Sequence, residues 1–327
     1  MIRDSFNGHI AYIQHMSSCG GPEIADYESH LNWYDGLALQ IAGGHFSTEQ
    51  VAALRSAFGD AYLTSKTMQG AAYVKQYGYP GDFSVIERIY SNTTSTDPRL
   101  RKFDEFFHAQ AAPQAVRNRK QYFKDLIREL RSRIEGPLRV LNLASGPCRE
   151  MKELFDEGIE GVQFVCVEGD ELAISHAKGL LRNDERVEFV QRNILRYRPS
   201  TKFHLVWSSG LFDYFVDRVF VRLFSRFLEF VAPGGEIVIG NFGLENPTRN
   251  YMEALAQWYL HHRSDAKLTE LVNAAGATGT HRVSIECEPT GINRFVRVAC
   301  SPASVRFDLE YESQRPAHDS PSRERRG

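Results

Sequence analysis

The residues best suited to chemistry lie in a small-residue turn that joins an aliphatic run to a helical stretch. The turn, Ala144-Ser145-Gly146, follows Asn142, and its small side chains allow the backbone to approach a ligand closely. The helix start beyond it offers free backbone N–H groups and the positive end of a helix dipole, which suit a carboxylate. Asn142, Ala144, Ser145 and Gly146 are therefore candidate ligand-binding residues. Similar turns also occur in α/β domains that bind nothing there.

An acidic residue stands at the end of the next predicted strand. Glu168 lies about twenty residues beyond the turn, a spacing at which a carboxylate can accept hydrogen bonds from both hydroxyls of a ribose. Gly169 adjoins it and is a candidate for the same site. Asp170 is the next acid, and we expect it to cap the helix that follows. The spacing predicts a nucleoside-binding site.

Polar residues also end the third and fourth predicted strands. Asn193 follows the third strand, where its side-chain amide could face an adenine edge. Ser208 and Ser209 end the fourth strand, and Asp213 and Tyr214 follow it. Because the carboxyl ends of parallel strands meet at one edge of a sheet, we expect these side chains to lie near the turn.

The elements that would position these residues begin near Leu138. From there, short β-branched and aliphatic runs alternate with helical stretches, a pattern that predicts a mainly parallel sheet. The last two runs have no helix between them and are joined by Glu288-Pro289-Thr290-Gly291, which predicts a hairpin. We therefore predict an α/β, Rossmann-like, seven-stranded, mostly parallel sheet with one antiparallel edge hairpin. The predicted strands are 139–143, 163–167, 187–190, 203–207, 236–240, 281–287 and 293–299.

Residues 1–135 have helical periodicity instead. Helices are predicted over 49–58, 100–108 and 115–134, and a turn-rich loop over 77–82. We therefore predict three parts. These are a helical N-terminal lid region (1–135), a Rossmann-like ligand-binding domain (136–309) and a polar, charged, disordered tail (310–327).

The composition excludes several classes of protein. Apolar residues make up 42% of the chain, as in ordinary globular proteins. The formal net charge of -2 argues against nucleic acid as a partner. The five cysteines form no CxxC pair, so neither a disulfide framework nor a metal site is predicted. No apolar run reaches the roughly 20 residues that cross a bilayer, and Met1 to Tyr12 lacks a signal-peptide core. We expect a cytoplasmic protein with no stable membrane insertion.

Taken in order, these motifs resemble the class I S-adenosylmethionine-dependent methyltransferases over about residues 138–300, including the turn Ala232-Pro233-Gly234-Gly235. The resemblance implies S-adenosylmethionine as cofactor and methyl transfer as reaction. Three positions depart from the pattern: Ala144 stands at the first glycine of the usual GxG, Cys148 where another glycine is common, and Asn142 where an acid is often found. A nicotinamide dehydrogenase would usually carry a fuller G-x-G-x-x-G motif.

A narrower resemblance covers about residues 65–300. It is to the bacterial methyltransferases of extracellular-factor (3-hydroxypalmitic acid methyl ester) biosynthesis. It implies methyl transfer to a carboxylate or hydroxyl of a small molecule, such as a hydroxy fatty acid or another secondary metabolite. A homodimer is left open. The segments that carry it are Tyr77–Asp82, Ala115–Arg119, Ser145–Glu150, Ser209–Tyr214 and Thr290–Asn293.

The helical region is suited to cover the cofactor and exclude water. Tyr77 and Tyr79 are the best aromatic candidates because they lie in a loop, and aromatic faces can hold a sulfonium cation. For the other aromatic residues of this region, such as Phe103, packing in a helical core is favoured. Arg117 and Asn118 form either a clamp for an acidic group or a solvated helix face.

The chemistry depends on the acceptor. A carboxylate is already ionised at neutral pH, whereas a hydroxyl needs a base, for which Asp213, Tyr214 and Tyr259 are candidates. Tyr259 is predicted to lie on a helix next to His261-His262. None of them stands out as a base, which favours a carboxylate or an acceptor that is activated by its position alone. One alternative is a cyclase that converts S-adenosylmethionine into azetidine-2-carboxylate and methylthioadenosine. Another is a non-catalytic binding module.

Overall fold

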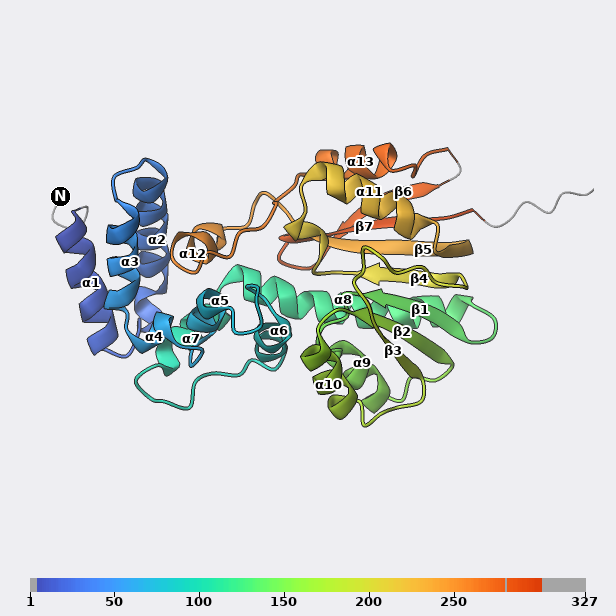
Figure 1. The fold of residues 1–327 in the computed structure, drawn as a ribbon, viewed down its shortest axis with the longest axis horizontal. Coiled ribbons are helices and arrows are strands. Elements are labelled where there is room, and N and C mark those ends of the chain that lie inside the picture. The colour runs from blue at the N-terminus through green and yellow to red at the C-terminus, as the bar shows by residue number, and fades with distance from the viewer. Residues whose placement is uncertain (1–4, 280, 302–327) are drawn as a thin grey trace, which may run out of the picture.

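A computed structural model describes residues 5–279 and 281–301 of the 327-residue chain. Its elements form a helical part and a sheet part that lie side by side along the long axis (Figure 1). The long helix α8 (Ala111–Arg133) runs from the first part across the second. The predicted tail, 310–327, lies outside the described residues.

The sheet has seven strands in the order β3-β2-β1-β4-β5-β7-β6. The first five strands of this order pair in parallel, and β7 is antiparallel to both β5 and β6. The predicted fold class, with its antiparallel edge hairpin, is therefore confirmed. The strands are β1 (Leu138–Leu143), β2 (Val162–Glu168), β3 (Val187–Gln191), β4 (Phe203–Ser208), β5 (Val231–Phe242), β6 (Arg282–Cys287) and β7 (Asn293–Ala299).

Helices cover both faces of the sheet, so β1 is apolar on both sides. Successive side chains of a strand point to opposite faces. Val140 accordingly joins a core with α8, α9 (Arg149–Asp156) and α10 (Glu171–Leu180). Leu141 joins a core with α11 (Asp217–Leu228) and α13 (Asp265–Ala274) on the other face.

Short helices make up the helical part, and α3, α7 and α8 correspond to the three that the sequence predicts. A capping box at Ser47 begins α3, as its Ser-Thr start signal indicates. The elements are α1 (Phe6–Ser18), η2 (Ile24–Asp26), α2 (Tyr27–Ala42), α3 (Thr48–Ala57), α4 (Asp60–Leu63), α5 (Met68–Val74), α6 (Phe83–Tyr90) and α7 (Arg101–Ala109). None of the described helices is long and apolar enough to cross a membrane. The cytoplasmic location stays a prediction.

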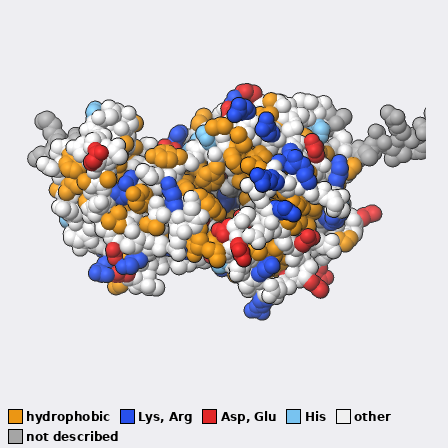
Figure 2. Space-filling model, viewed as in Figure 1, with side chains coloured by type: hydrophobic (Ala, Val, Ile, Leu, Met, Phe, Trp, Pro, Cys, Tyr) orange, Lys and Arg blue, Asp and Glu red, His pale blue; other side chains and the backbone are white. Residues whose placement is uncertain are grey.

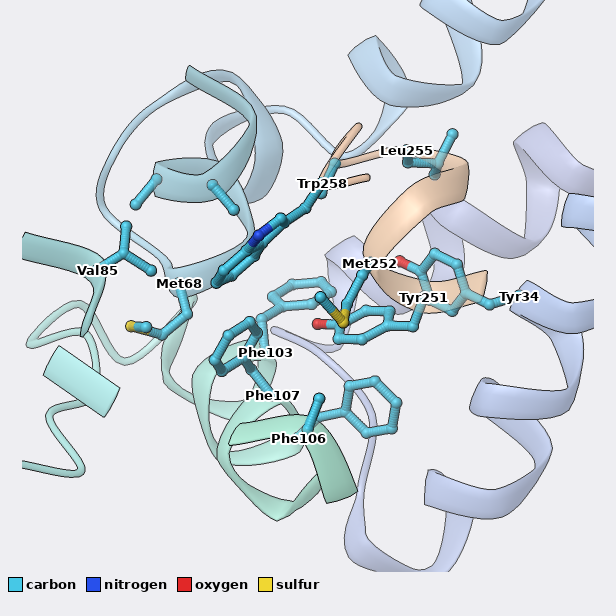
Figure 3. Close-up of a cluster of buried hydrophobic side chains, with 14 of the residues drawn as sticks. Tyr34, Met68, Val85, Phe103, Phe106, Phe107, Tyr251, Met252, Leu255 and Trp258 are labelled. Atoms are coloured by element: carbon cyan, nitrogen blue, oxygen red, sulfur yellow. The ribbon is translucent and has the colours of Figure 1, made fainter. Parts of the chain in front are cut away.

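A segment between β5 and α13 returns to the helical part. It contains α12 (Arg249–Ala254), whose Tyr251 ring meets the Tyr34 ring of α2 at 4.8 Å, edge to face. Leu255 and Trp258 are buried in the same core (Figure 3). The helical part is therefore built from two stretches of the chain. The division at residues 135 and 136 stays a prediction.

The helix predicted around Tyr259 and His261 is wrong. Residues 257–264 have no regular secondary structure. Their backbone groups bond to other elements: the His261 N–H donates to the Asp213 carbonyl at 2.7 Å, and the Arg263 N–H to the Phe242 carbonyl at 3.0 Å. These bonds replace those that a helix would make within itself.

Candidate functional site

A cavity of about 730 Å³ lies where the helical part meets the carboxyl ends of the parallel strands. Asn142 and Glu168 line it from the ends of β1 and β2, and Trp207 from β4. Tyr90 of α6 and Arg119 of α8 line it from the helical side. Hydrophobic side chains gather around the hollow between the two parts (Figure 2). The strand order reverses between β1 and β4, which is where open α/β sheets bind ligands.

The turn after β1 uses left-handed backbone at three positions. Ala144 has φ +54°, Gly146 +57° and Cys148 +57°. Side chains rarely adopt this region, which costs about 1–3 kcal/mol for a non-glycine residue. Ala144 and Cys148 therefore adopt a left-handed backbone conformation that glycine usually occupies. A Cβ on Gly146 would meet nothing within 4 Å, because the turn faces the open cavity.

Glu168 is held against this turn by three backbone groups. Its Oε2 accepts from the Gly146 N–H at 3.0 Å, and its Oε1 accepts from Gly169 at 2.7 Å and Asp170 at 3.1 Å. A carboxylate has about four lone-pair sites, so with three in use one remains for the ribose. Asp170 accepts from the Leu172 N–H and so caps α10, as predicted.

In the turn and the helix that follows it, two buried polar atoms have no hydrogen-bond partner among the described residues. They are Ser145 Oγ and Glu150 Oε2, and both side chains line the cavity. Burial raises the pKa of Glu150 to about 7, although Arg119 opposes that shift. Buried polar groups without partners are rare in native proteins. These two atoms fit a polar ligand group in the cavity. Glu150 is not among the site residues that the sequence predicts.

Arg119 is the arginine that reaches the cavity from α8. It is 6% exposed and donates from Nη1 to the Ser209 carbonyl at 2.9 Å. Its Nε and Nη2 lie 3.4 and 3.3 Å from the Tyr90 hydroxyl. Glu150 and Asp213 both contribute to its electrostatic environment. A single cation therefore lies between two buried carboxyl groups.

The predicted clamp residues Arg117 and Asn118 lie outside the cavity lining. Arg117 donates to the His108 carbonyl at 2.7 Å, and Asn118 donates to Glu288 Oε2 at 2.7 Å. Successive residues of a helix are rotated by about 100°, so Arg119 shares the buried face of Val116 while its neighbours do not. The helix phase was the available signal for Arg119.

Asp213 lines the cavity, and one of its two carboxylate oxygens is engaged by the backbone. Its Oδ1 accepts from the Phe242 N–H at 2.6 Å, and Oδ2 has no hydrogen bond among the described residues. Burial raises the pKa of Asp213 to about 7, while Arg119 and Arg263 oppose this shift. By contrast, the Tyr214 hydroxyl donates to the Pro80 carbonyl and accepts from Trp258 Nε1. Burial raises the pKa of the Tyr214 hydroxyl, so this group keeps its proton and is a poor base.

Some of the other predicted site residues line the cavity, and some do not. Tyr77, Tyr79 and Asn193 line the cavity, and burial raises the pKa of Tyr79 well above its usual value. Ser208 does not line it, because its hydroxyl donates to the Leu143 carbonyl between β4 and β1. Tyr259 is 60% exposed and also lies outside the lining, in a segment without regular secondary structure.

Several apolar residues that line the cavity are not among those that the sequence predicts. Phe215, Phe242, Trp258 and Leu260 line the side of the cavity near Asp213. Three of them lie within or beyond β5, in a stretch whose return to the helical part the local sequence pattern does not indicate. Among the described residues, no group of three His, Cys, Asp or Glu side chains could hold a metal ion.

The loop over the cavity requires glycine at position 81. Gly81 has φ +73°, and a Cβ there would lie 2.4 Å from Trp258 Cζ2. We expect Gly81→Ala to lower the free energy of unfolding by about 1–3 kcal/mol more than Gly78→Ala does, because overpacking adds to the backbone cost. Gly78 also has a positive φ, but no atom lies within 4 Å of its added Cβ. Urea denaturation of both variants tests this, and equal losses would contradict it.

Comparisons with known proteins agree with this geometry. Residues 140–235 match a family model described as "Methyltransferase domain". A solved structure from Bordetella parapertussis, titled a possible exported protein, is 17% identical with a TM-score of 0.61. The match covers 91% of this chain and 97% of that one. The CMeT domain of the citrinin polyketide synthase is 13% identical with a TM-score of 0.50, covering 78% of this chain and 65% of that one. No curated protein matches the chain.

The sheet part is a class I methyltransferase domain: it combines the seven-stranded fold with the matched family segment. The chain therefore contains a methyltransferase domain over residues 140–235, for which the cofactor is S-adenosylmethionine.

Proposed function

We propose that this enzyme transfers the methyl group of S-adenosylmethionine to a hydroxyl or carboxylate of a small molecule. The observation that carries the proposal is the cavity. Its walls are the strand ends on one side and aromatic side chains of the helical part on the other. Methyl transfer from a sulfonium is an in-line displacement that depends on alignment and on exclusion of water. A cavity closed over strand ends supplies both.

The nucleoside half of the cofactor fits the first three strand ends. Glu168, fixed by backbone N–H groups, would accept a hydrogen bond from the ribose. Asn193 lines the cavity just beyond β3, where its amide would meet the adenine edge, although its Oδ1 also accepts from the Leu195 N–H. Tyr77 and Tyr79 would lie over the cofactor from the loop between α5 and α6.

The methionine half fits the charged residues beyond the turn. Arg119 would bind the carboxylate, since a guanidinium donates to both carboxylate oxygens. Glu150 Oε2 and Ser145 Oγ, which lack partners, would accept from the ammonium group. Glu150 would thus replace the acid that is absent at Asn142. The buried polar atoms of this chain fit the zwitterionic end of the cofactor.

No observation favours the cyclase alternative. Self-cyclisation requires the lone pair of the cofactor's own amino group. A contact with the Glu150 carboxylate would stabilise that group as an ammonium, which has no lone pair. The hydroxy fatty acid and secondary-metabolite acceptors implied by the narrower resemblance remain predictions.

A single incubation separates these reactions. The purified enzyme is mixed with S-adenosylmethionine alone, and the products are identified by mass spectrometry. We expect the cofactor to remain intact until an acceptor is added, and S-adenosylhomocysteine to form thereafter. Methylthioadenosine in the absence of an acceptor would overturn methyl transfer in favour of self-cyclisation.

Removing the ribose contact should weaken cofactor binding. We expect Glu168→Ala to reduce the affinity for S-adenosylhomocysteine by about 1–3 kcal/mol, the scale of lost charge-assisted hydrogen bonds. Isothermal titration calorimetry measures this. Glu171→Ala, an exposed acid of α10 outside the cavity lining, is the control. Unchanged affinity in Glu168→Ala would remove Glu168 from the ribose.

A further inference from the structure

We infer that the acceptor is an uncharged hydroxyl on an apolar, aromatic molecule, and that Asp213 accepts its proton during transfer. This inference rests on the proposed function and narrows its acceptor. It reverses the expectation from sequence, where the lack of a distinct base favoured a carboxylate.

The charges around the cavity exclude a carboxylate acceptor. Four acidic side chains line it, and Arg119 is the one Lys or Arg in the lining among the described residues. The cofactor's own carboxylate would occupy Arg119, so no cationic side chain of the lining remains to bind a second carboxylate. A second anion would lie near Asp213 and Glu150, and like charges in a buried site repel strongly. The acidic lining residues are Glu150, Glu168, Asp170 and Asp213.

An ammonium acceptor is disfavoured for the opposite reason. It would have to approach the sulfonium that carries the methyl group, and Arg119 is close by. Both are cations, and an ammonium has no lone pair with which to attack. A neutral hydroxyl meets neither repulsion and keeps its lone pairs.

Asp213 has the geometry that such a hydroxyl needs. Asp213 lines the cavity, its Oδ1 accepts from the Phe242 N–H, and no hydrogen bond to Oδ2 is found among the described residues. The charged groups that face it are Arg119 from α8 and Arg263 from the segment before α13. Its neighbour Tyr214 donates its hydroxyl proton to the Pro80 carbonyl, and its oxygen accepts from Trp258 Nε1. Of the two predicted bases that line the cavity, Asp213 is therefore the one better placed to accept a proton.

The transfer step balances without any further reactant. The acceptor O–H bond breaks as its proton moves to Asp213 Oδ2. The oxygen forms a bond to the methyl carbon as the carbon–sulfur bond breaks, and sulfur keeps the electron pair. The products are a methyl ether and S-adenosylhomocysteine, and the proton leaves Asp213 to water when the cavity opens.

The walls near Asp213 indicate the body of the acceptor. Phe215, Phe242, Trp258 and Leu260 line this side, and Trp258 Nε1 is already bonded to Tyr214. Aromatic and aliphatic walls with few free polar groups select a flat apolar molecule over a polar one. A sugar or a nucleotide would leave its polar groups without partners here.

A pair of matched probes tests the inference by binding. 2-Naphthol and 2-naphthoate share one ring system and differ in the group that would be methylated. Each is titrated calorimetrically at pH 8 into the enzyme saturated with S-adenosylhomocysteine. We expect naphthol to bind at least about tenfold more tightly, equivalent to 1.4 kcal/mol. Naphthoate binding as tightly as naphthol, or binding of neither probe, would overturn the inference.

Variants connect the preference to Asp213. We expect Asp213→Asn to reduce the difference in affinity between naphthol and naphthoate by improving naphthoate binding. The variant removes the repelling charge and keeps an acceptor for the Phe242 N–H. Glu229→Gln is the control, since Glu229 is exposed beyond the end of α11 and outside the lining. An unchanged preference in Asp213→Asn would show that another group sets it.

Product chemistry gives a second readout with both probes as acceptors. With S-adenosylmethionine labelled in its methyl group, an ether keeps the label in mild alkali, whereas a methyl ester releases labelled methanol. We expect alkali-stable label from naphthol. Alkali-labile label from naphthoate would overturn the hydroxyl acceptor but leave methyl transfer intact. Failure of the enzyme to bind S-adenosylmethionine would instead overturn the proposed function itself.

Discussion

Asp213→Asn is expected to lower kcat by about 10²–10⁴-fold, the usual contribution of a positioned general base. The asparagine amide cannot accept the acceptor's proton, but its carbonyl can still accept from the Phe242 N–H at the position of Oδ1. The affinity for S-adenosylhomocysteine should stay within about twofold, since cofactor binding is assigned to Glu168, Glu150 and Arg119. S-adenosylhomocysteine formation with 2-naphthol, followed by mass spectrometry, measures kcat.

The pH profile separates a base from a structural residue. Burial raises the pKa of Asp213 to about 7, so the wild-type kcat should increase as pH rises through 7. In Asp213→Asn this limb should disappear and leave a low, flat rate. A variant that keeps both the limb and the rate would contradict the role of Asp213.

The stability of Asp213→Asn at different pH values shows independently whether the variant folds. The folded-state pKa of Asp213 lies above its ordinary value of 3.8, so the folded protein holds a proton that the unfolded chain has lost. The contribution of this group to stability is full below pH 4 and is lost as pH rises towards and through 7. The neutral asparagine avoids this loss, so the variant should be at least as stable as the wild type at pH 8.

Arg119→Met is expected to weaken binding of S-adenosylhomocysteine by about 2–5 kcal/mol, the scale for removing one partner of a buried hydrogen-bonded charge pair. The loss should be confined to ligands with an amino-acid end. Methylthioadenosine lacks that end, so its affinity should change little. Calorimetric titration of both ligands into the wild type and the variant measures the difference.

The neighbouring Arg117→Met provides a matched control on the same helix. Arg117 bonds to the His108 carbonyl and lies outside the cavity lining, so its loss should leave both affinities unchanged. If Arg117→Met weakened S-adenosylhomocysteine binding and Arg119→Met did not, the clamp expected from sequence would be restored. Equal loss of both ligands in Arg119→Met would point to general disruption of the cavity.

The fold could be predicted from local sequence patterns. Strand–helix alternation and the loop at Glu288–Gly291 were enough for the seven-stranded sheet with its antiparallel edge, because each depends on residues near in sequence. The turn at Ala144–Gly146 and its spacing to Glu168 likewise follow from the βαβ unit. The structure brings these residues together through the Gly146 N–H bond to Glu168.

The rest depended on rotation and on distant contacts. Arg117 and Arg119 are nearly equivalent as letters, and only the helix phase decides which one reaches the cavity. Ser208 and Ser209 differ by the alternation of a strand, which directs the Ser208 hydroxyl to the Leu143 carbonyl. Trp258 could not be placed at all, because its segment packs on helices that lie far from it in sequence.

The return of α12 to the helical part also has a consequence for the order in which the enzyme becomes complete. Arg55 of α3 donates from Nε to the Leu255 carbonyl at 2.8 Å, a contact between residues 200 positions apart. During synthesis the first helices emerge early, but their core lacks Tyr251, Leu255 and Trp258 until most of the sheet has been made. Closing so long a loop is slow compared with local helix formation. The covering of the cavity is thus among the last features to form, after the strands whose ends it encloses.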